Sequence, residues 1–167
     1  MDILLFDKDQ YLNIRRLEKF GVTKADLIDY CNRVFEEVPA NSFFTVHSLN
    51  DQSDSKIDSL GFGELFFAEL LASSEKFLHT HVFGTDVFYK GNLSDGLSRK
   101  YFCMETLKSY ESVDLDDYIA DLYENYGIKV PDKYDVISVI NETDFYYDNI
   151  MQKIYRSKDE YYAEFDE

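Results

Sequence analysis

The hydrophobic pattern changes period several times between Thr23 and Lys90, and this succession constrains the fold more than any other feature of the sequence. Helical spacing of apolar residues alternates with short runs of aromatic and β-branched residues, which favour strands. Thr23, followed three residues later by Asp26, is typical of a helix start, and Pro39 ends that helix. In chain order the pattern predicts a helix over 23–38, a strand over 42–47, a helix over 62–72 and a β-hairpin over 77–90.

The rest of the chain is patterned mainly as helices. Residues 8–20 suit a short helix that ends at Gly21, and the segment 114–126 has a clear amphipathic pattern that ends at Gly127. Further expected elements are a helix over 99–110, a helix or strand over 132–141 and helical spacing over 147–155. The expected domains are an N-terminal helix (1–22), a mixed helix–hairpin unit (23–90), a linker rich in glycine and serine (91–98) and an acidic, tyrosine-rich helical unit (99–167). The expected fold class is α+β, mainly helical with a small β component.

Composition limits the partners that this chain can bind. Its 167 residues are 45% hydrophobic and 17% aromatic, which supplies enough apolar surface for a folded core. The formal net charge is −16, so binding to a nucleic-acid backbone or to an anionic membrane would work against the protein's own field. Residues 111–167 carry −11 of this charge and residues 1–110 carry −5. The acidic character is therefore concentrated in the last third of the chain.

Neither the start of the sequence nor its cysteines indicate export. The start has four consecutive apolar residues and no basic leader, which falls short of a signal peptide. No run approaches the roughly 18–20 apolar residues of a membrane-spanning helix. Cys31 and Cys103 both lie in helical patterns, so we expect two buried thiols rather than a disulfide framework or a four-cysteine zinc site. We expect a cytoplasmic protein that does not contact membranes.

The element order over 23–90 resembles a winged helix, in which a β-hairpin, the wing, follows a recognition helix. A second, helix-turn-helix-like unit with a degenerate wing is expected over 98–155. The phrases that carry the resemblance are Phe43-Phe44-Thr45-Val46, Leu60-Gly61-Phe62, Tyr126-Gly127-Ile128 and Tyr146-Tyr147-Asp148. They are similar to the C-terminal regions of sigma-factor-like helix-turn-helix proteins of low-GC bacteria or their phages. The resemblance to tandem winged-helix modules implies a context of transcription or nucleic acid and assigns no activity.

The expected recognition helix lacks the residues with which such helices contact DNA. The segment 62–72 contains Glu64 and Glu69 but no lysine or arginine, and the hairpin over 77–90 has Lys90 as its one fixed cation. A DNA-reading helix normally supplies Arg, Lys, Asn or Gln to bases and phosphates. Direct binding to nucleic acid is therefore disfavoured.

No catalytic motif stands out, and we expect a protein that is not an enzyme and that has no cofactor or resident metal. His79 and His81 lie two residues apart on an expected strand, so both rings would face one side, and His47 lies on another strand. Three imidazoles could ligate zinc. We favour histidines that are exposed or hydrogen-bonded, and the sequence leaves open whether the three converge.

Acidic residues on the segment 114–126 are the strongest functional indication. Asp117, Asp121 and Glu124 follow helical spacing opposite the apolar face, with a charge density that approaches that of one strand of duplex phosphates. Tyrosines accompany the acids, and aromatic residues are enriched at protein interfaces. The residues expected to bind a partner are Asp114, Asp117, Asp121, Glu124, Asp144, Asp148, Tyr146 and Tyr161.

Our leading interpretation is a non-catalytic, acidic protein that engages a basic nucleic-acid-binding protein. Its carboxylates would occupy the Lys and Arg sites that phosphates use, by analogy with the nucleic-acid-mimicking inhibitors that phages direct against bacterial defence enzymes. The alternative is a winged-helix transcription regulator that binds DNA through a local basic patch near the N-terminus. The residues of that patch are Arg15, Arg16, Lys19, Lys24 and Arg33. Formation of a homodimer is left open.

Overall fold

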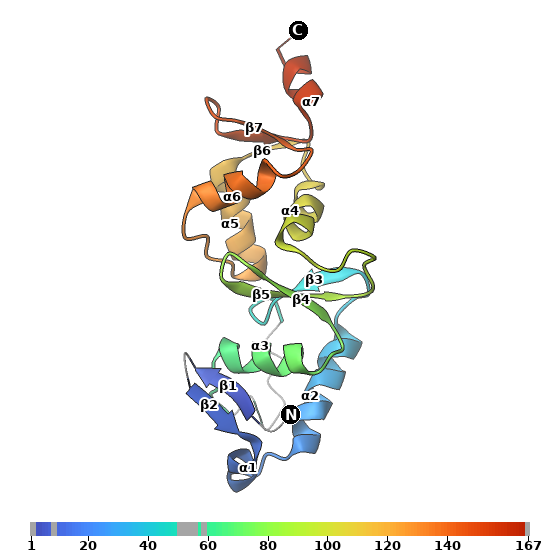
Figure 1. Cartoon of the computed structure of the whole chain (residues 1–167), viewed down its shortest axis with the longest axis vertical. Helices are drawn as coiled ribbons and strands as arrows, with labels where there is room; N and C mark the ends of the chain where they lie inside the picture. Colours follow the sequence, from blue (N-terminus) through green and yellow to red (C-terminus); the bar gives the residue numbers. More distant parts are fainter. Residues whose placement is uncertain (1–2, 8–9, 50–56, 58–59, 166–167) are drawn as a thin grey trace. The chain divides into compact units, whose positions relative to one another are not determined.

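A computed structural model describes residues 3–7, 10–49, 57 and 60–165 (Figure 1). Within these residues the fold is α+β, as the sequence predicts. Helices accompany two three-stranded antiparallel sheets and one two-stranded hairpin. No helix in this part of the chain combines the length and the apolar character needed to cross a membrane.

The chain divides into two compact units. Unit 1 comprises Met1–His79 and Asp86–Gly96, and unit 2 comprises Thr80–Thr85 and Leu97–Glu167. The main change of unit therefore falls inside the segment 91–98, which is rich in glycine and serine.

Unit 1 begins with a β-hairpin, so the helix predicted over 8–20 is wrong. Strand β1 (Ile3–Asp7) pairs antiparallel with β2 (Gln10–Asn13), and only the short helix α1 (Ile14–Leu17) and a 3-10 turn (Glu18–Phe20) follow. An isolated helix of this length is marginal in water. Pairing with β1 gives the backbone of β2 hydrogen-bond partners that local helical spacing does not reveal. The predicted residues 8 and 9 lie outside the described residues.

The next elements follow the sequence pattern. They are α2 (Lys24–Glu37), β3 (Ser42–Phe44), α3 (Glu64–Ser73), β4 (Leu78–Val82) and β5 (Thr85–Lys90). The Asp26 N–H donates to Thr23 Oγ1 at 3.3 Å, and the Thr23 N–H donates to the Asp26 carboxylate at 2.7 Å. This reciprocal pair is a capping box, which confirms the predicted start of α2.

Short strands in unit 1 enclose an aromatic core. Phe44 lies 4.9 Å from Phe77 and 5.3 Å from Phe88, measured between ring centroids, and all three side chains are buried. The strand predicted over 42–47 ends early, because the Thr45 N–H donates to Ser48 Oγ at 2.8 Å instead of continuing the sheet. This part of the core is therefore formed by aromatic side chains from β3, from β5 and from Phe77, which precedes β4.

Unit 2 contains a β-hairpin where helical spacing predicted a helix over 147–155. Its elements are α4 (Arg99–Leu107), β6 (Ser112–Asp114), α5 (Leu115–Tyr126), α6 (Lys133–Ile140), β7 (Tyr146–Asp148), β8 (Lys153–Tyr155) and α7 (Lys158–Ala163). Tyr147 and Ile154 are seven residues apart, which fits two helical turns, but they are also direct partners across β7 and β8. The same spacing suits a hairpin, and pairing with β6 decides in its favour.

The two units share one order of elements and one sheet topology. In each, a helix and a single strand are followed by one helix (unit 1) or two helices (unit 2) and then by a hairpin. Unit 1 also has β1, β2 and α1 before this order, and unit 2 has α7 after it. The sheet orders are β3-β5-β4 and β6-β8-β7. In both sheets the isolated strand therefore pairs with the second strand of the hairpin.

Buried groups hold unit 2 together on both sides of α5. Tyr118 and Phe102 are fully buried, and the Tyr118 hydroxyl lies 2.8 Å from Thr106 Oγ1 on α4. Cys103 in this core and Cys31 in unit 1 are free, buried thiols, as predicted. Burial raises the pKa of each thiol to about 11.

Candidate functional site

Helix α5 presents an exposed face of three carboxylates and one tyrosine. Its buried side consists of Leu115, Tyr118 and Leu122. The opposite side is exposed and holds Asp117 and Glu124, while Asp116 and Tyr123 lie on one flank. We call these four residues the acidic face (Asp116, Asp117, Tyr123, Glu124). Within the described residues, none of its three carboxylates forms an ion pair.

The three carboxylates differ in their effect on the stability of α5. Asp116 and Asp117 lie in the first turn of α5, where the helix dipole stabilises negative charge. Glu124 lies in the last turn, where the dipole disfavours an acid, and no basic residue lies in that turn. Helix stability therefore explains the two aspartates but not Glu124, which is the stronger functional indication.

Asp121 does not belong to the acidic face, although helical spacing aligned it with Asp117. Its side chain is half-buried and accepts a hydrogen bond from the Tyr110 hydroxyl. Burial, together with this carboxylate, raises the pKa of Tyr110 to about 12. Asp121 therefore joins α5 to the segment that follows α4, a role that the pattern did not indicate.

Asp148 is buried, so its predicted place on an exposed acidic surface is wrong. Only 5% of the residue is exposed. Its Oδ1 accepts hydrogen bonds from the Ile150 N–H at 2.8 Å and from the Met151 N–H at 2.6 Å, and Tyr161 donates its hydroxyl to the same carboxylate. These bonds close the β7–β8 turn, which is a common role for aspartate at the start of a turn.

The Asp148→Asn variant is expected to lose stability in a pH-dependent way. The backbone N–H groups at the turn lower the pKa of Asp148, because they favour the charged carboxylate. A carboxyl group with a lowered folded-state pKa stabilises the protein above its unfolded pKa, and this contribution is lost as pH falls through the folded pKa. The difference in unfolding free energy between the native protein and the variant should therefore be larger at pH 7 than in acid. Urea denaturation across this range measures it, and a difference independent of pH would contradict the assigned role.

The remaining predicted residues divide into exposed acids and packed tyrosines. Asp114 and Asp144 are exposed. The rings of Tyr146 and Tyr161 are half-buried with centroids 4.8 Å apart, and Tyr161 also lies 5.2 Å from Tyr155. The two predicted tyrosines therefore pack α7 against the β7–β8 hairpin rather than forming an exposed rim.

Two tyrosines that the sequence analysis did not select lie beside the acidic face. Tyr134, in the first turn of α6, is 67% exposed. The pKa of Tyr147 is raised by burial and then by the charges of Tyr134, Asp116 and Asp148, so Tyr134 and Asp116 act electrostatically on the same side chain. In the sequence, Tyr134 is marked only by its position two residues after the helix cap Asp132. That position does not indicate whether the side chain is exposed.

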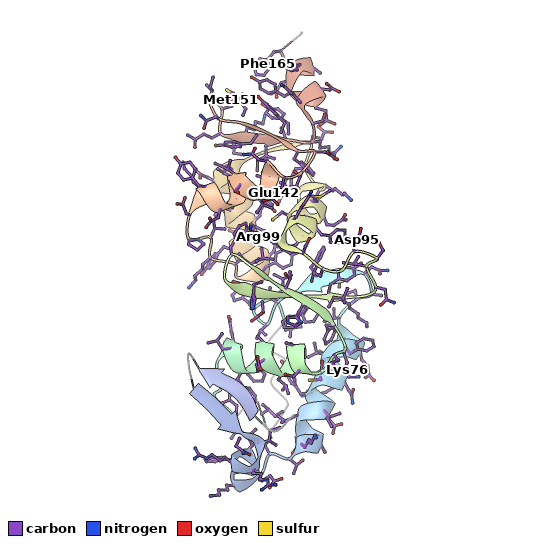
Figure 2. The ribbon with its side chains drawn as sticks, viewed as in Figure 1. Lys76, Asp95, Arg99, Glu142, Met151 and Phe165 are labelled. Atoms are coloured by element: carbon purple, nitrogen blue, oxygen red, sulfur yellow. The ribbon has the colours of Figure 1, made fainter. Side chains whose placement is uncertain are left out.

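The tip of the β7–β8 hairpin is apolar and exposed. Ile150 is 88% exposed and Met151 is 53% exposed, and Figure 2 shows Met151 at the end of this hairpin. Their neighbours in the turn, Asn149 and Gln152, are uncharged. The tip therefore offers no cation to a phosphate backbone.

The structure does not gather the five predicted N-terminal cations into one patch. Arg15, Arg16 and Lys19 are exposed in the short helical segment before Gly21. Lys24 and Arg33 are nine residues apart on α2, a spacing that places them on opposite sides of the helix. Arg33 instead lies over the Tyr30 ring, 5.9 Å from its centroid. Lys24 and Arg33 therefore cannot both join one patch with the other three cations.

Helix α3, which holds the place of the predicted recognition helix, is not available as an exposed reading helix. Half of its residues are buried, and β1 lies alongside it (Figure 1). Lys90, the one fixed cation of the following hairpin, donates through Nζ to the carbonyl oxygens of Phe35 and of Val38, the latter at 2.8 Å. The Lys90 ammonium group therefore caps the carboxyl end of α2.

All three histidines are exposed. His47 Nδ1 lies 3.5 Å from the Glu64 carboxylate, and His79 and His81 are both exposed on β4. Among the residues that the structure describes, no three His, Cys, Asp or Glu side chains form a group that could hold a metal ion.

Comparison with models of protein families, with curated proteins and with solved structures gives no significant match.

Proposed function

We propose that both units are winged-helix modules and that the chain is a non-catalytic protein that binds a basic, nucleic-acid-binding partner. The shared order of helix, strand, helix and hairpin supports the first part, as does a sheet in which the lone strand pairs with the second strand of the wing. The net charge of −16 supports the second.

The observation that carries this proposal is the acidic face. Its carboxylates are exposed and unpaired within the described residues, and the exposed tyrosines Tyr123 and Tyr134 accompany them. Exposed carboxylates steer a basic partner and speed its association, while tyrosine supplies contact area at low entropic cost. A surface of this kind competes with phosphates for lysine and arginine side chains. The partner would therefore lose access to nucleic acid while this protein is bound.

The same geometry argues against DNA reading by either unit. In unit 1, α3 has no lysine or arginine and β1 lies alongside it. In unit 2, the exposed residues of α6 include Lys133 but also Asp135, and the tip of the following hairpin is apolar. DNA-binding helices and wings normally supply several cations to phosphates and base edges. The exposed Arg15, Arg16 and Lys19 make DNA binding the competing outcome of the test below.

The experiment is capture followed by competition. The immobilised full chain is incubated with a nuclease-treated lysate of the source cells, and bound proteins are eluted with duplex DNA of about two helical turns or with rising salt. We expect a basic protein that duplex DNA displaces and that salt releases between about 0.1 and 0.5 M, where screening is strong. A captured protein that duplex DNA does not displace would reject the mimicry. Direct binding of the DNA by this chain at low salt, with no such protein captured, would establish the regulator instead.

A further inference from the structure

Unit 1 contains a surface hollow of about 250 Å³, and none of its lining residues belongs to the acidic face. It opens between α1, α2 and the carboxyl end of α3. Its lining residues are Ile14, Lys24, Leu27, Ile28, Cys31, Leu70, Ser73, Ser74 and Lys76. Most of the lining area is therefore apolar, with two lysines and two serines as its polar groups.

Helical spacing explains how α2 builds one wall of this hollow. Lys24, Ile28 and Cys31 recur at positions 0, 4 and 7 and so share a side of the helix. Ile28 is an apolar side chain on this side of α2, yet it is 50% exposed. It lines the hollow together with Leu27 and Cys31. An apolar residue at a concave, open position is a common feature of ligand sites.

Two cations face this apolar wall in a chain that is otherwise strongly acidic. Neither Lys24 nor Lys76 forms an ion pair within the described residues. Lys76 Nζ lies 5.3 Å from the centroid of the Phe35 ring, and Figure 2 places Lys76 just past the carboxyl end of α3. Lys76 is also close enough to Cys31 to act electrostatically on its thiol. The hollow thus combines an apolar floor with positive charge that no carboxylate of the described chain neutralises.

We infer that this hollow binds a small amphipathic carboxylate, with its hydrocarbon part against Leu27, Ile28 and Leu70 and its negative charge attracted by the two lysines that line the hollow, Lys24 and Lys76. The volume sets the size. A cavity of about 150 Å³ holds benzene, so about 250 Å³ suits a ligand of roughly ten heavy atoms. Octanoate has this size and both chemical features, and it serves as the probe.

The test uses the full chain, labelled with ¹⁵N and titrated with octanoate, and compares it with the neutral analogue octanol. We expect saturable chemical-shift changes confined to the lining residues, with a dissociation constant of about 0.1–1 mM. The double variant Lys24→Gln, Lys76→Gln should bind octanoate about fivefold more weakly, because the partly screened attraction of two lysines for the carboxylate is lost. Its affinity for octanol should not change. The matched control, Lys19→Gln with Lys100→Gln, removes two exposed lysines that do not line the hollow and should bind like the native protein.

A further variant tests the apolar part separately. Ser73→Leu places a larger side chain in the hollow from its half-buried position on α3 and should abolish binding of both probes. Shifts spread over the surface, equal weakening in the control variant, or octanoate binding that survives Ser73→Leu in a folded protein would each overturn the inference.

Discussion

The Phe102→Ala variant is expected to lose about 3–5 kcal/mol of the free energy of unfolding of unit 2. Phe102 on α4 is fully buried, and its ring meets the Tyr126 ring edge-on with centroids 5.1 Å apart. Truncation removes this aromatic pair and leaves a cavity that the surrounding helices fill only in part. Because the chain has no tryptophan, denaturation is best followed by circular dichroism.

The matched control for this variant is Tyr134→Ala. It removes an aromatic ring of similar size from another helix of the same unit, but one that is 67% exposed. Its effect on the unfolding free energy should stay within about 0.5 kcal/mol. Equal losses in the two variants, or a loss below about 1 kcal/mol for Phe102→Ala, would show that the core is assigned incorrectly.

Reversal of two charges on the acidic face should weaken binding of the captured partner roughly 30- to 100-fold, which corresponds to about 2–3 kcal/mol. The variant is Asp117→Lys with Glu124→Lys. Each substitution removes an attraction to a basic surface and adds a repulsion, so the effect exceeds that of neutral replacement. The fold should tolerate both, because Asp117→Lys opposes the helix dipole at one end of α5 while Glu124→Lys favours it at the other.

The control for this experiment reverses two acids at the end of another helix. Glu36 and Glu37 are exposed in the last turn of α2, in unit 1. Reversal of both to lysine gives the same net charge as the test variant and should leave most of the affinity intact. Affinity is measured at several salt concentrations, and the acidic-face variant should also show a weaker salt dependence. Equal weakening by the two variants would mean that net charge alone governs binding, and it would reject the acidic face as the site.

Local signals in the sequence predicted several elements of this fold correctly. The Thr23–Asp26 capping box and Pro39 delimit α2, and Gly127, with a φ of 67°, ends α5 in the left-handed conformation. The hairpin predicted over 77–90 forms, although its turn lies at Phe83 and Gly84, both with positive φ, rather than at Gly84, Thr85 and Asp86 as the glycine suggested. These features depend on neighbours within four residues, so the sequence alone contains the interactions that determine them.

The candidate site was only partly predictable, because some of its residues contact segments that are distant in sequence. Helical spacing correctly opposed Asp117 and Glu124 to the buried side of α5, but it also selected Asp121, which bonds to Tyr110 from another segment. Tyr123 is apolar enough to fit the buried face of an amphipathic helix, yet it is 49% exposed. Spacing along one helix reveals which residues share a side, but it does not reveal which neighbouring segments cover that side.

The sequence by itself determined the charge, the helix ends and the alternation of helices with hairpins from Thr23 to Lys90, because these follow from composition and from contacts between near neighbours. Tertiary structure alone decided that residues 10–13 form a strand against β1, that Tyr147 and Ile154 face each other across a hairpin, and that Asp148 is buried. In the first two cases the backbone groups of a paired strand form the hydrogen bonds. In the third, the N–H groups of the β7–β8 turn donate to the Asp148 carboxylate. For the segments 10–13 and 147–155, the free energy of strand pairing exceeds the weak local preference for a helix.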